Sequence, residues 1–444
     1  MNDHTVLSGS AEQADTEASF DWRACWYPVS FLEDLPRDGP TAVSLYDTGL
    51  VLFFDGDGEL HCLRDLCPHR AARLSDGQIV DGRLECLYHG WQFDGAGDCQ
   101  FIPQMLPDKD YPIRSCVRRY PLAVRDGIVW IWAGDVDAAD PARIPRSPGA
   151  GGEDVHEVTF QMDLPYDQSY LIENVIDVAH IHIAHDGVRG GGLREAAKPL
   201  QFDVAHSGPD GIRATFRSIG LERGDGDAKI AGAQVEFVAP NLIRYASNYA
   251  DPELVAGLDL YSLPIGKGRC RLLYRKYSNF TGWRERIKPR WLEHQTQCLI
   301  LEQDMNVVVG QHEEIERAGK RLRDLWLPIK TSDKLVVEYR KWLDRHGSGL
   351  PFFRGFERAQ NSGIDPEEAR QPHDRRSLHT AICATCQRVA RRIDQGIKLA
   401  AVVAVLAFSL AILVPGTAAK ATLVGVALVA VSTIAALRNL RQRI

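Results

Sequence analysis

Residues 67–91 read CPHRAARLSDGQIVDGRLECLYHGW, and two parts of this stretch decide the fold of the first third of the chain. Cys67 and His69 form a C-x-H pair, and Cys86 and His89 form a C-x-x-H pair. A strand-like hairpin separates the two pairs, so all four side chains can converge. Two thiolates and two neutral imidazoles hold a 2Fe-2S cluster whose potential is raised by the imidazoles. We therefore expect these four residues to bind a cluster that accepts and passes single electrons.

The same four ligands would also satisfy a tetrahedral zinc ion. A C-x-H spacing is unusual for zinc, whereas CPHR followed by CxYHGW is the specific signature of Rieske iron–sulfur proteins. The iron–sulfur cluster is the favoured interpretation. Two nearby cysteines, Cys62 and Cys99, are expected to pack as small apolar groups.

A second group of candidate ligands lies in residues 173–185, ENVIDVAHIHIAH. In a helix, steps of three residues put Asn174, Asp177 and His180 on one face, and His185 follows little more than one turn later. Two imidazoles and one carboxylate leave one side of an octahedron open for dioxygen and substrate, as in non-haem Fe(II) oxygenases. We expect His180 and His185 to bind mononuclear Fe(II). Asp177, with Asn174 beside it, is expected to orient His180 and relay the electron.

The carboxylate ligand must come from elsewhere in the chain. Asp304 in LILEQDM, residues 299–305, is the best candidate, because an unpaired acid within an apolar helix is costly to bury and a metal removes that cost. Glu302 is the competing choice and lies about half a helical turn away. His182 is offset from the ligand face and is expected to pack or to support the site from outside.

The 444 residues, 45% of them hydrophobic, suffice for two or three structural units. Short β-branched runs between DG-type turns predict an antiparallel domain, and a mixture of strands with helical stretches at Asp167–His185 and Trp283–Gly310 predicts an α+β domain. The predicted organisation is a disordered tail at 1–20, an iron–sulfur domain at 21–145, a catalytic domain at 155–370, a linker at 371–396 and a transmembrane hairpin at 397–438.

Charge and cysteine content exclude two other classes. The net charge of −7 comes from 52 basic and 59 acidic residues without a basic block between aromatics, so no nucleic-acid partner is expected. Ten cysteines are too sparse for a disulfide scaffold. The first twenty residues have the features of neither a secretory signal nor a transit peptide.

Two runs near the end, Leu399–Val414 and Ala421–Leu437, contain no charged side chain and predict a transmembrane helical hairpin. A buried amphipathic pair is the weaker alternative, because neither run has a polar face. Basic residues on both flanks place the soluble domains on the cytoplasmic side of the membrane. These residues are Arg388, Arg391, Arg392, Lys398, Arg438, Arg441 and Arg443.

Together these segments resemble pheophorbide a oxygenase and its relatives, a membrane-bound branch of the Rieske oxygenases that includes protochlorophyllide-related and inner-envelope translocon proteins. The likeness covers nearly the whole chain. The matching segments are DWRACWYPV at 21–29, LCPHRAARLSDGQI at 66–79, LECLYHGWQFDGAGDCQFIPQ at 84–104, IENVIDVAHIHIAH at 172–185, LEQD at 301–304, CATC at 383–386 and the final apolar hairpin. The alanine-, arginine- and glycine-rich composition favours a bacterial homologue.

The resemblance implies a Rieske β domain followed by a helix-grip catalytic domain. It implies that Cys67, His69, Cys86 and His89 bind the cluster and that His180, His185 and Asp304 bind the iron. It further implies a homotrimer in which the cluster of one subunit reduces the iron of its neighbour through Asp177. In plant members, the pair matching Cys383 and Cys386 is thought to be a thioredoxin-addressable switch, based on thiol–disulfide exchange. Two unreactive thiols remain the alternative here.

The expected function is oxidation of a hydrophobic substrate by Fe(II) and dioxygen. No G-x-G-x-x-G segment follows a predicted strand, so a separate ferredoxin and ferredoxin reductase must supply the electrons. By family analogy the substrate is an oligopyrrole, either chlorin-like or prodiginine-like. Oxidative cyclisation or desaturation of a linear tripyrrole is one alternative. A non-catalytic membrane redox sensor is another, and the intact second ligand set argues against it.

Overall fold

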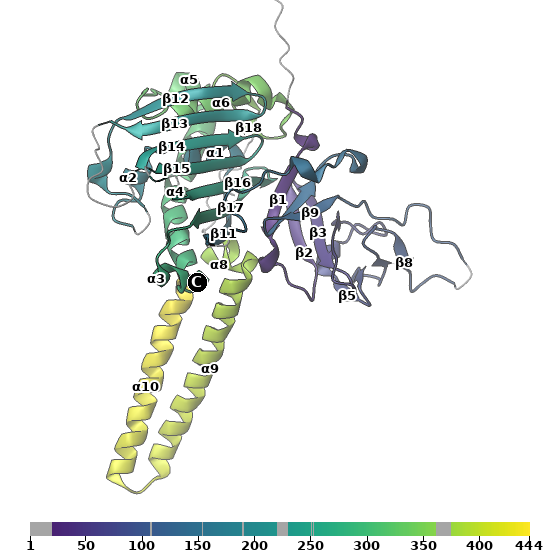
Figure 1. Cartoon of the computed structure of the whole chain (residues 1–444). Coiled ribbons are helices and arrows are strands. Elements are labelled where there is room, and N and C mark those ends of the chain that lie inside the picture. Colours follow the sequence, from purple (N-terminus) through teal and green to yellow (C-terminus); the bar gives the residue numbers. More distant parts are fainter. Residues whose placement is uncertain are drawn as a thin grey trace, which may run out of the picture.

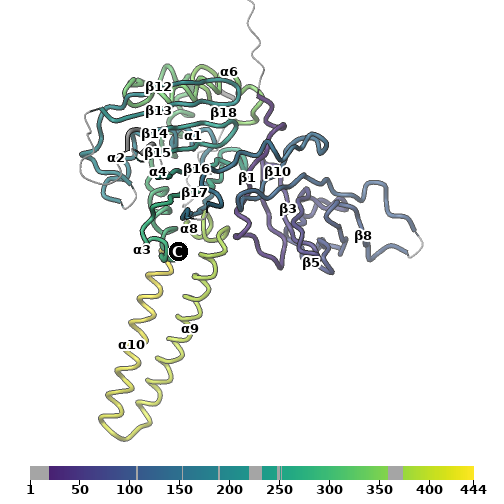
Figure 2. Tube along the Cα trace, in the orientation of Figure 1, coloured from purple at the N-terminus to yellow at the C-terminus, as the bar shows by residue number. Residues whose placement is uncertain are grey.

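A computed structural model describes residues 20–106, 109–152, 154–188, 191–219, 230–249, 251, 253–360 and 374–444 of the chain. The folded head consists of a smaller β domain beside a larger α+β domain, and two long helices project from its base (Figures 1 and 2). Apart from Phe20, the tail predicted at 1–20 lies outside the described residues.

The β domain is built from three small antiparallel sheets. One sheet joins β1 (Trp26–Phe31), β10 (Ile128–Trp132) and β9 (Leu122–Arg125), and a second joins β2 (Thr41–Leu45), β3 (Thr48–Phe54) and β4 (Leu60–Arg64). The third comprises β5 (Gln78–Val80), β6 (Arg83–Glu85), β7 (Gln92–Phe93) and β8 (Cys99–Phe101). This third sheet lies at the end of the head farthest from the α+β domain (Figure 1). We call this end of the β domain, residues 66–105, the tip.

The tip contains a tight hairpin turn whose residue types suit its geometry. Asp81 and Gly82 join β5 to β6 with φ values of +48° and +75°. Positive φ at both positions is the geometry of a two-residue hairpin turn, for which Asp-Gly is a preferred sequence. The tip packs on β3 in a small core separate from the main one, in which Val51 and Phe53 of β3 meet Phe93, Cys67 and Cys86 of the tip.

The α+β domain is organised around one seven-stranded antiparallel sheet. Its strands run in the order β11-β17-β16-β15-β14-β13-β12. They are β11 (His156–Leu164), β12 (Leu200–Gly208), β13 (Gly211–Ser218), β14 (Ile230–Val238), β15 (Leu242–Tyr249), β16 (Ala256–Gly266) and β17 (Arg269–Ser278). The helices α1 (Gln168–Ile176), α4 (Arg290–Ala318) and α6 (Lys334–His346) pack with this sheet.

The single helix predicted at Asp167–His185 is wrong, because the segment forms two helices. Helix α1 ends at Ile176, and α2 covers only Ile181–Ala184. Between them, the Asp177 carboxylate accepts a hydrogen bond from the Ala179 N–H at 2.8 Å. This local turn gives the backbone an alternative to the helical pattern. His180 therefore does not share a helical face with Asn174. The change of direction between the two helices brings His180 to the site instead.

The second long helix also begins later than predicted. Residues Trp283–Arg286 form the short helix α3, and α4 starts at Arg290 directly after Pro289. Proline lacks an N–H group and disfavours helical geometry in the residue before it, so a helix starts rather than continues there. Helix α4 runs on to Ala318, eight residues beyond the predicted end at Gly310.

A buried ion pair holds α1 against α6. The Arg340 side chain is fully buried and donates to the Glu173 carboxylate, to Ser169 Oγ at 3.0 Å and to the Arg354 carbonyl at 2.6 Å. The carboxylate and the two further acceptors compensate for much of the water that the buried guanidinium loses, although its second terminal nitrogen has no hydrogen-bond partner among the described residues. The pair fixes the helix whose end carries Asp177.

Helices α9 (Ala384–Leu413) and α10 (Thr417–Gln442) form the antiparallel hairpin that leaves the head (Figure 1). Both are long and apolar enough to cross a membrane, and most of their apolar surface is exposed. The linker predicted at 371–396 is in part helical, because α9 begins at Ala384.

Candidate metal centres

Two matching loops at the tip carry the predicted cluster ligands. The Ala71 N–H donates to the Cys67 carbonyl at 3.0 Å, and the Gly90 N–H donates to the Cys86 carbonyl at 2.9 Å. Ala71 and Gly90 have φ values of +59° and +73°. A Cβ at Gly90 would lie 3.0 Å from Pro103, so glycine suits this position for space as well as for conformation.

The thiol pair and the imidazole pair face different surroundings. Cys67 and Cys86 are buried, whereas His69 is exposed and His89 half-buried. The two imidazole ring centroids lie 4.4 Å apart, and His69 stacks on Trp91 at 4.9 Å. Burial raises the pKa of the Cys67 thiol to about 11, so a thiolate there needs a bound cation. This donor set fits a Rieske 2Fe-2S cluster with its thiolate side inside and its imidazole side at the surface.

The second predicted set also comes together. His180 and His185 flank α2, and Asp304 lies on α4. The Asp304 Oδ1 atom is 3.2 Å from His185 Nε2 and 3.7 Å from His180 Nε2, and the ligand atoms of all three residues lie within 4.8 Å of one another. Asp304 is buried, and a buried carboxylate facing two imidazoles suits a mononuclear iron.

Gln303 orients one of these ligands and was missed in the sequence. Its side-chain oxygen lies 3.0 Å from His185 Nδ1, so Nδ1–H donates to it and Nε2 is left to bind the metal. The hydrogen bond with Asp304 raises the pKa of His185. The only sequence signal for Gln303 is its position next to Asp304.

Asp177 lies close to His180 without a hydrogen bond to it. The Asp177 Oδ2 atom is 3.8 Å from His180 Nδ1, and His180 Nδ1 is buried with no hydrogen-bond partner among the described residues. Burial raises the pKa of Asp177. Asn174, Asp177, His180 and Asp304 all line one cavity of about 540 Å³. The cavity thus brings Asn174 to the same lining as two of the three proposed iron ligands.

The two other candidates are placed outside the ligand set. Both Glu302 carboxylate oxygens accept hydrogen bonds from Arg375 at 2.7 Å, so Glu302 faces a guanidinium instead of the iron site. His182 does not belong to the ligand group. Cys62 and Cys99 are buried in the apolar cores of the β domain.

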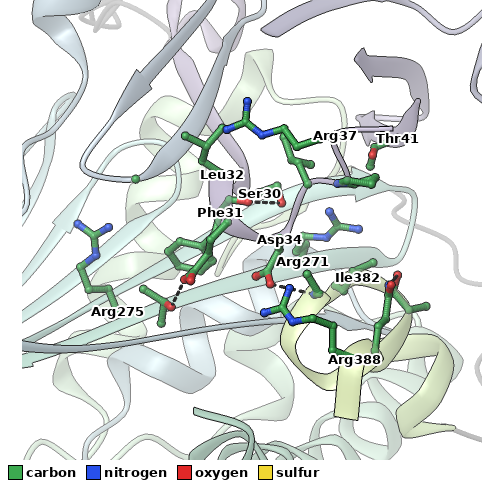
Figure 3. A pocket seen from close by; sticks show the side chains of 18 of the residues that line it. Ser30, Phe31, Leu32, Asp34, Arg37, Thr41, Arg271, Arg275, Ile382 and Arg388 are labelled. Carbon is green, nitrogen blue, oxygen red and sulfur yellow. Dashed lines mark hydrogen bonds between the residues drawn. The ribbon is translucent and has the colours of Figure 1, made fainter. Parts of the chain in front are cut away.

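A larger cavity of about 1270 Å³ lies where the β domain, the sheet edge and the start of α9 meet (Figure 3). Arginine and acidic side chains both line its wall, and Asp34 lies beside Ile382 (Figure 3). None of the cluster or iron ligands lines it. Its size therefore does not mark it as the site of the iron chemistry.

Residues 25–121 match the Rieske [2Fe-2S] domain, and residues 237–321 match the pheophorbide a oxygenase family. The solved structure of dicamba monooxygenase bound to dicamba aligns with a TM-score of 0.59 and 24% identity, covering 74% of this chain and 98% of that chain. The fold and the two donor sets thus define a Rieske non-haem iron oxygenase, which confirms the predicted fold class, enzyme class and cofactors.

Two curated relatives narrow the assignment. Protein TIC 55, chloroplastic, from Arabidopsis thaliana is 32% identical, and the alignment covers 95% of this chain and 82% of the relative. Pheophorbide a oxygenase, chloroplastic, from Arabidopsis thaliana is 33% identical, with 85% and 74% covered. The chain belongs to the pheophorbide a oxygenase family of Rieske oxygenases.

Proposed function

We propose that this chain is a membrane-anchored oxygenase that oxidises a hydrophobic oligopyrrole, chlorin-like or prodiginine-like, with dioxygen and electrons from a ferredoxin and its reductase. One observation carries the proposal: the complete set of His180, His185 and Asp304 beside Asp177, in a chain that also has a complete cluster set. A non-catalytic redox sensor would need no such second set.

The bound iron would supply activation of dioxygen at its open side. The residues of the chain prepare that site. Gln303 fixes the ring of His185, and the break between α1 and α2 turns His180 toward Asp304. Asp177 lies on the other side of His180, 3.8 Å from its Nδ1 atom, and is the proposed relay for the electron.

The electron route that we propose crosses between two copies of the chain. In one chain the tip, which holds the cluster ligands, and α2, which lies between the iron ligands, are at opposite ends of the head (Figure 1). A cluster in this position is better placed to reduce the iron of a neighbouring subunit than the iron of its own chain. A homotrimer would allow such an arrangement.

The surfaces of the two sites support that assembly. Leu87 and Tyr88 at the tip are 65% and 57% exposed next to His89. At the cavity beside Asp177, Val307 and Leu327 are 63% and 94% exposed. Apolar side chains of this kind become buried when the tip of one subunit covers the cavity of the next.

The substrate class follows from what the relatives are named for. They include chlorophyllide a oxygenase from Arabidopsis thaliana at 28% identity and flavonoid 8-hydroxylase 2 from Ocimum basilicum at 31% identity. Pheophorbide a and chlorophyllide a are tetrapyrroles, and all these names describe flat, largely apolar ring systems. An oligopyrrole is the substrate that agrees best with this group.

A membrane anchor would hold the enzyme at the lipid phase, where such an apolar substrate concentrates. We propose that α9 and α10 cross a membrane, with the head on the cytoplasmic side. Arg388, Arg391 and Arg392 lie near the start of α9, and Arg438 and Arg441 near the end of α10, so both basic ends face the side of the head.

The test is a single turnover of reduced protein under ¹⁸O₂ with a panel of chlorins and linear oligopyrroles. Label in the product supports the oxygenase. An unlabelled product lighter by two hydrogens means oxidative cyclisation or desaturation at the same iron. Protein that holds the cluster but no mononuclear iron after anaerobic reconstitution would instead favour the redox sensor.

The intersubunit route has its own test. Chains with Cys67→Ser and Cys86→Ser lack the cluster, and chains with Asp304→Ala lack the iron. Co-assembly of the two inactive chains should restore turnover, because each neighbour supplies what the other lacks. If co-assembled trimers stay inactive while wild-type trimers treated identically are active, the route between subunits is wrong.

A further inference from the structure

Four buried side chains meet where the head joins the hairpin. The ligand atoms of His294, His379, Cys383 and Cys386 lie within 4.8 Å of one another. All four residues are between 0% and 2% exposed. The Cys386 Sγ atom is 3.3 Å from His379 Nε2 and 3.4 Å from His294 Nδ1, and Cys383 Sγ is 3.5 Å from His294 Nδ1. The mechanism of the oxygenase uses none of these groups.

Backbone carbonyls of β11 orient both imidazoles. The Thr159 carbonyl lies 2.8 Å from His294 Nε2, and the Gln161 carbonyl lies 2.7 Å from His379 Nδ1. A carbonyl only accepts, so these two nitrogens carry the protons. The nitrogens that face the sulfur atoms, His294 Nδ1 and His379 Nε2, therefore present lone pairs. Histidines that bind metals are commonly held by such a hydrogen bond on the far nitrogen.

We propose that His294, His379, Cys383 and Cys386 bind one zinc ion, which fastens the hairpin to the iron-bearing domain. Zinc bonds of ~2.3 Å to sulfur and ~2.0–2.1 Å to nitrogen put tetrahedral ligand atoms about 3.3–3.8 Å apart. The observed sulfur–nitrogen distances of 3.3, 3.4 and 3.5 Å fall within that range. Binding releases two thiol protons, and two thiolates then balance the charge of Zn²⁺ in this buried place.

Burial favours a metal over a reactive thiol pair. A redox-active thiol must be accessible to its partner. Cys383 and Cys386 are 0% and 2% exposed, and each sulfur atom faces an imidazole nitrogen.

The ligands come from separate elements, so the ion would act as a clamp. His294 lies on α4, His379 follows α8 (Arg375–Leu378), and Cys383 and Cys386 lie at the start of α9. Asp304 is ten residues beyond His294 on α4, about 15 Å away at the usual helical rise. The clamp therefore sets the position of the hairpin relative to the helix that carries the iron ligand.

Asp34 supports the same junction from the side of the larger cavity. Its carboxylate accepts from the Ala384 N–H at 3.0 Å and pairs with Arg290 at 3.2 Å. Ala384 and Arg290 are the first residues of α9 and α4. The two helices thus begin side by side, which holds their ligands in position before any ion binds.

The experiment measures zinc and iron per chain in full-length protein purified in detergent without a metal-affinity tag. Because the tip has the same ligand types, the Cys67→Ser/Cys86→Ser variant is included to remove that site. We expect one zinc per chain in the wild type and in this variant, and none in Cys383→Ser/Cys386→Ser. Cys298→Ser is the matched control, since Cys298 is buried one turn from His294 and should keep the zinc.

Zinc-edge X-ray absorption of the wild type gives a readout that does not depend on a variant folding. It should show two sulfur ligands at ~2.3 Å and two nitrogen ligands at ~2.0–2.1 Å. Zinc lost with Cys67→Ser/Cys86→Ser and kept with Cys383→Ser/Cys386→Ser would overturn the proposal. So would wild-type protein that lacks zinc and contains a Cys383–Cys386 disulfide or two free thiols. Neither result depends on whether the oxygenase assignment holds.

Discussion

The chain contains two sets of two cysteines and two histidines, and they differ in where the imidazoles lie. At the tip, His69 is exposed and His89 half-buried, with the thiols inside. At the hairpin junction, His294 and His379 are both 1% exposed. An electron carrier needs one edge at the surface, whereas a structural zinc site is closed. The same ligand types thus serve opposite purposes according to their burial.

The two sets also differ in the elements that carry them. The tip ligands come from two short loops within 23 residues of sequence, and each loop is closed by its own backbone hydrogen bond. The junction ligands span residues 294 to 386 and come from α4, the segment after α8, and α9. A local site needs its domain alone to fold, while the junction site ties separate elements together.

The largest expected effect tests this contrast with one histidine from each set. His69→Ala removes an iron ligand, so the cluster EPR signal and turnover should both disappear. His379→Ala should leave the cluster signal intact, remove the zinc and lower the Tm by at least about 3 °C, given that ~1 kcal/mol corresponds to roughly 2–4 °C in a domain of 150–250 residues. Loss of the cluster signal in His379→Ala would show that the two sites are not independent.

Asp304→Ala should abolish turnover while the cluster spectrum stays unchanged. The buried carboxylate is the acid that faces both His180 and His185, and no other carboxylate belongs to that ligand group in the described chain. Glu302→Gln is the matched control, because Glu302 pairs with Arg375 and should be dispensable for iron. Iron analysis and product formation are measured together. Turnover retained in Asp304→Ala would refute the ligand assignment.

Asp177→Asn should keep both metals and slow single-turnover product formation by about 10–100-fold, the usual cost of altering a residue that supports a metal ligand. The side chain keeps its shape and its place 3.8 Å from His180 Nδ1 but loses its charge. EPR of the cluster and iron content confirm that both centres are present. A wild-type rate would exclude Asp177 from the electron route.

How far the sequence predicts these sites depends on how local they are. Cys67 to His69 and Cys86 to His89 are set by spacing within single loops, so the pattern alone identifies them. The iron site was harder, because Asp304 lies 119 residues from His185. From the sequence alone, the cost of burying an unpaired acid favours Asp304 over Glu302. The structure adds the reason that Glu302 is not a ligand, because Arg375 donates to both of its carboxylate oxygens.

Two features were not predictable from pattern. The break after Ile176 depends on one hydrogen bond from Ala179 to Asp177, which competes with a helix that the three-residue steps favour. The junction site was visible only as a C-x-x-C pair at Cys383 and Cys386. His294 lies 89 residues before Cys383, and no spacing rule connects residues that meet only through tertiary packing.

The smallest expected effect separates the zinc ligands from the ion pair beside them. Arg375 donates to both Glu302 oxygens at 2.7 Å and so links the segment before α9 to α4, as the zinc would. Because the two side chains are 18% and 30% exposed, Arg375→Gln should lower the free energy of unfolding by about 1 kcal/mol or less. Thermal unfolding and zinc content are measured on the same sample, and the zinc should stay at one per chain. If Arg375→Gln loses zinc as His379→Ala does, the Arg375–Glu302 ion pair is needed to bring the four zinc ligands together. The junction would then depend on its surroundings for metal binding, unlike the tip.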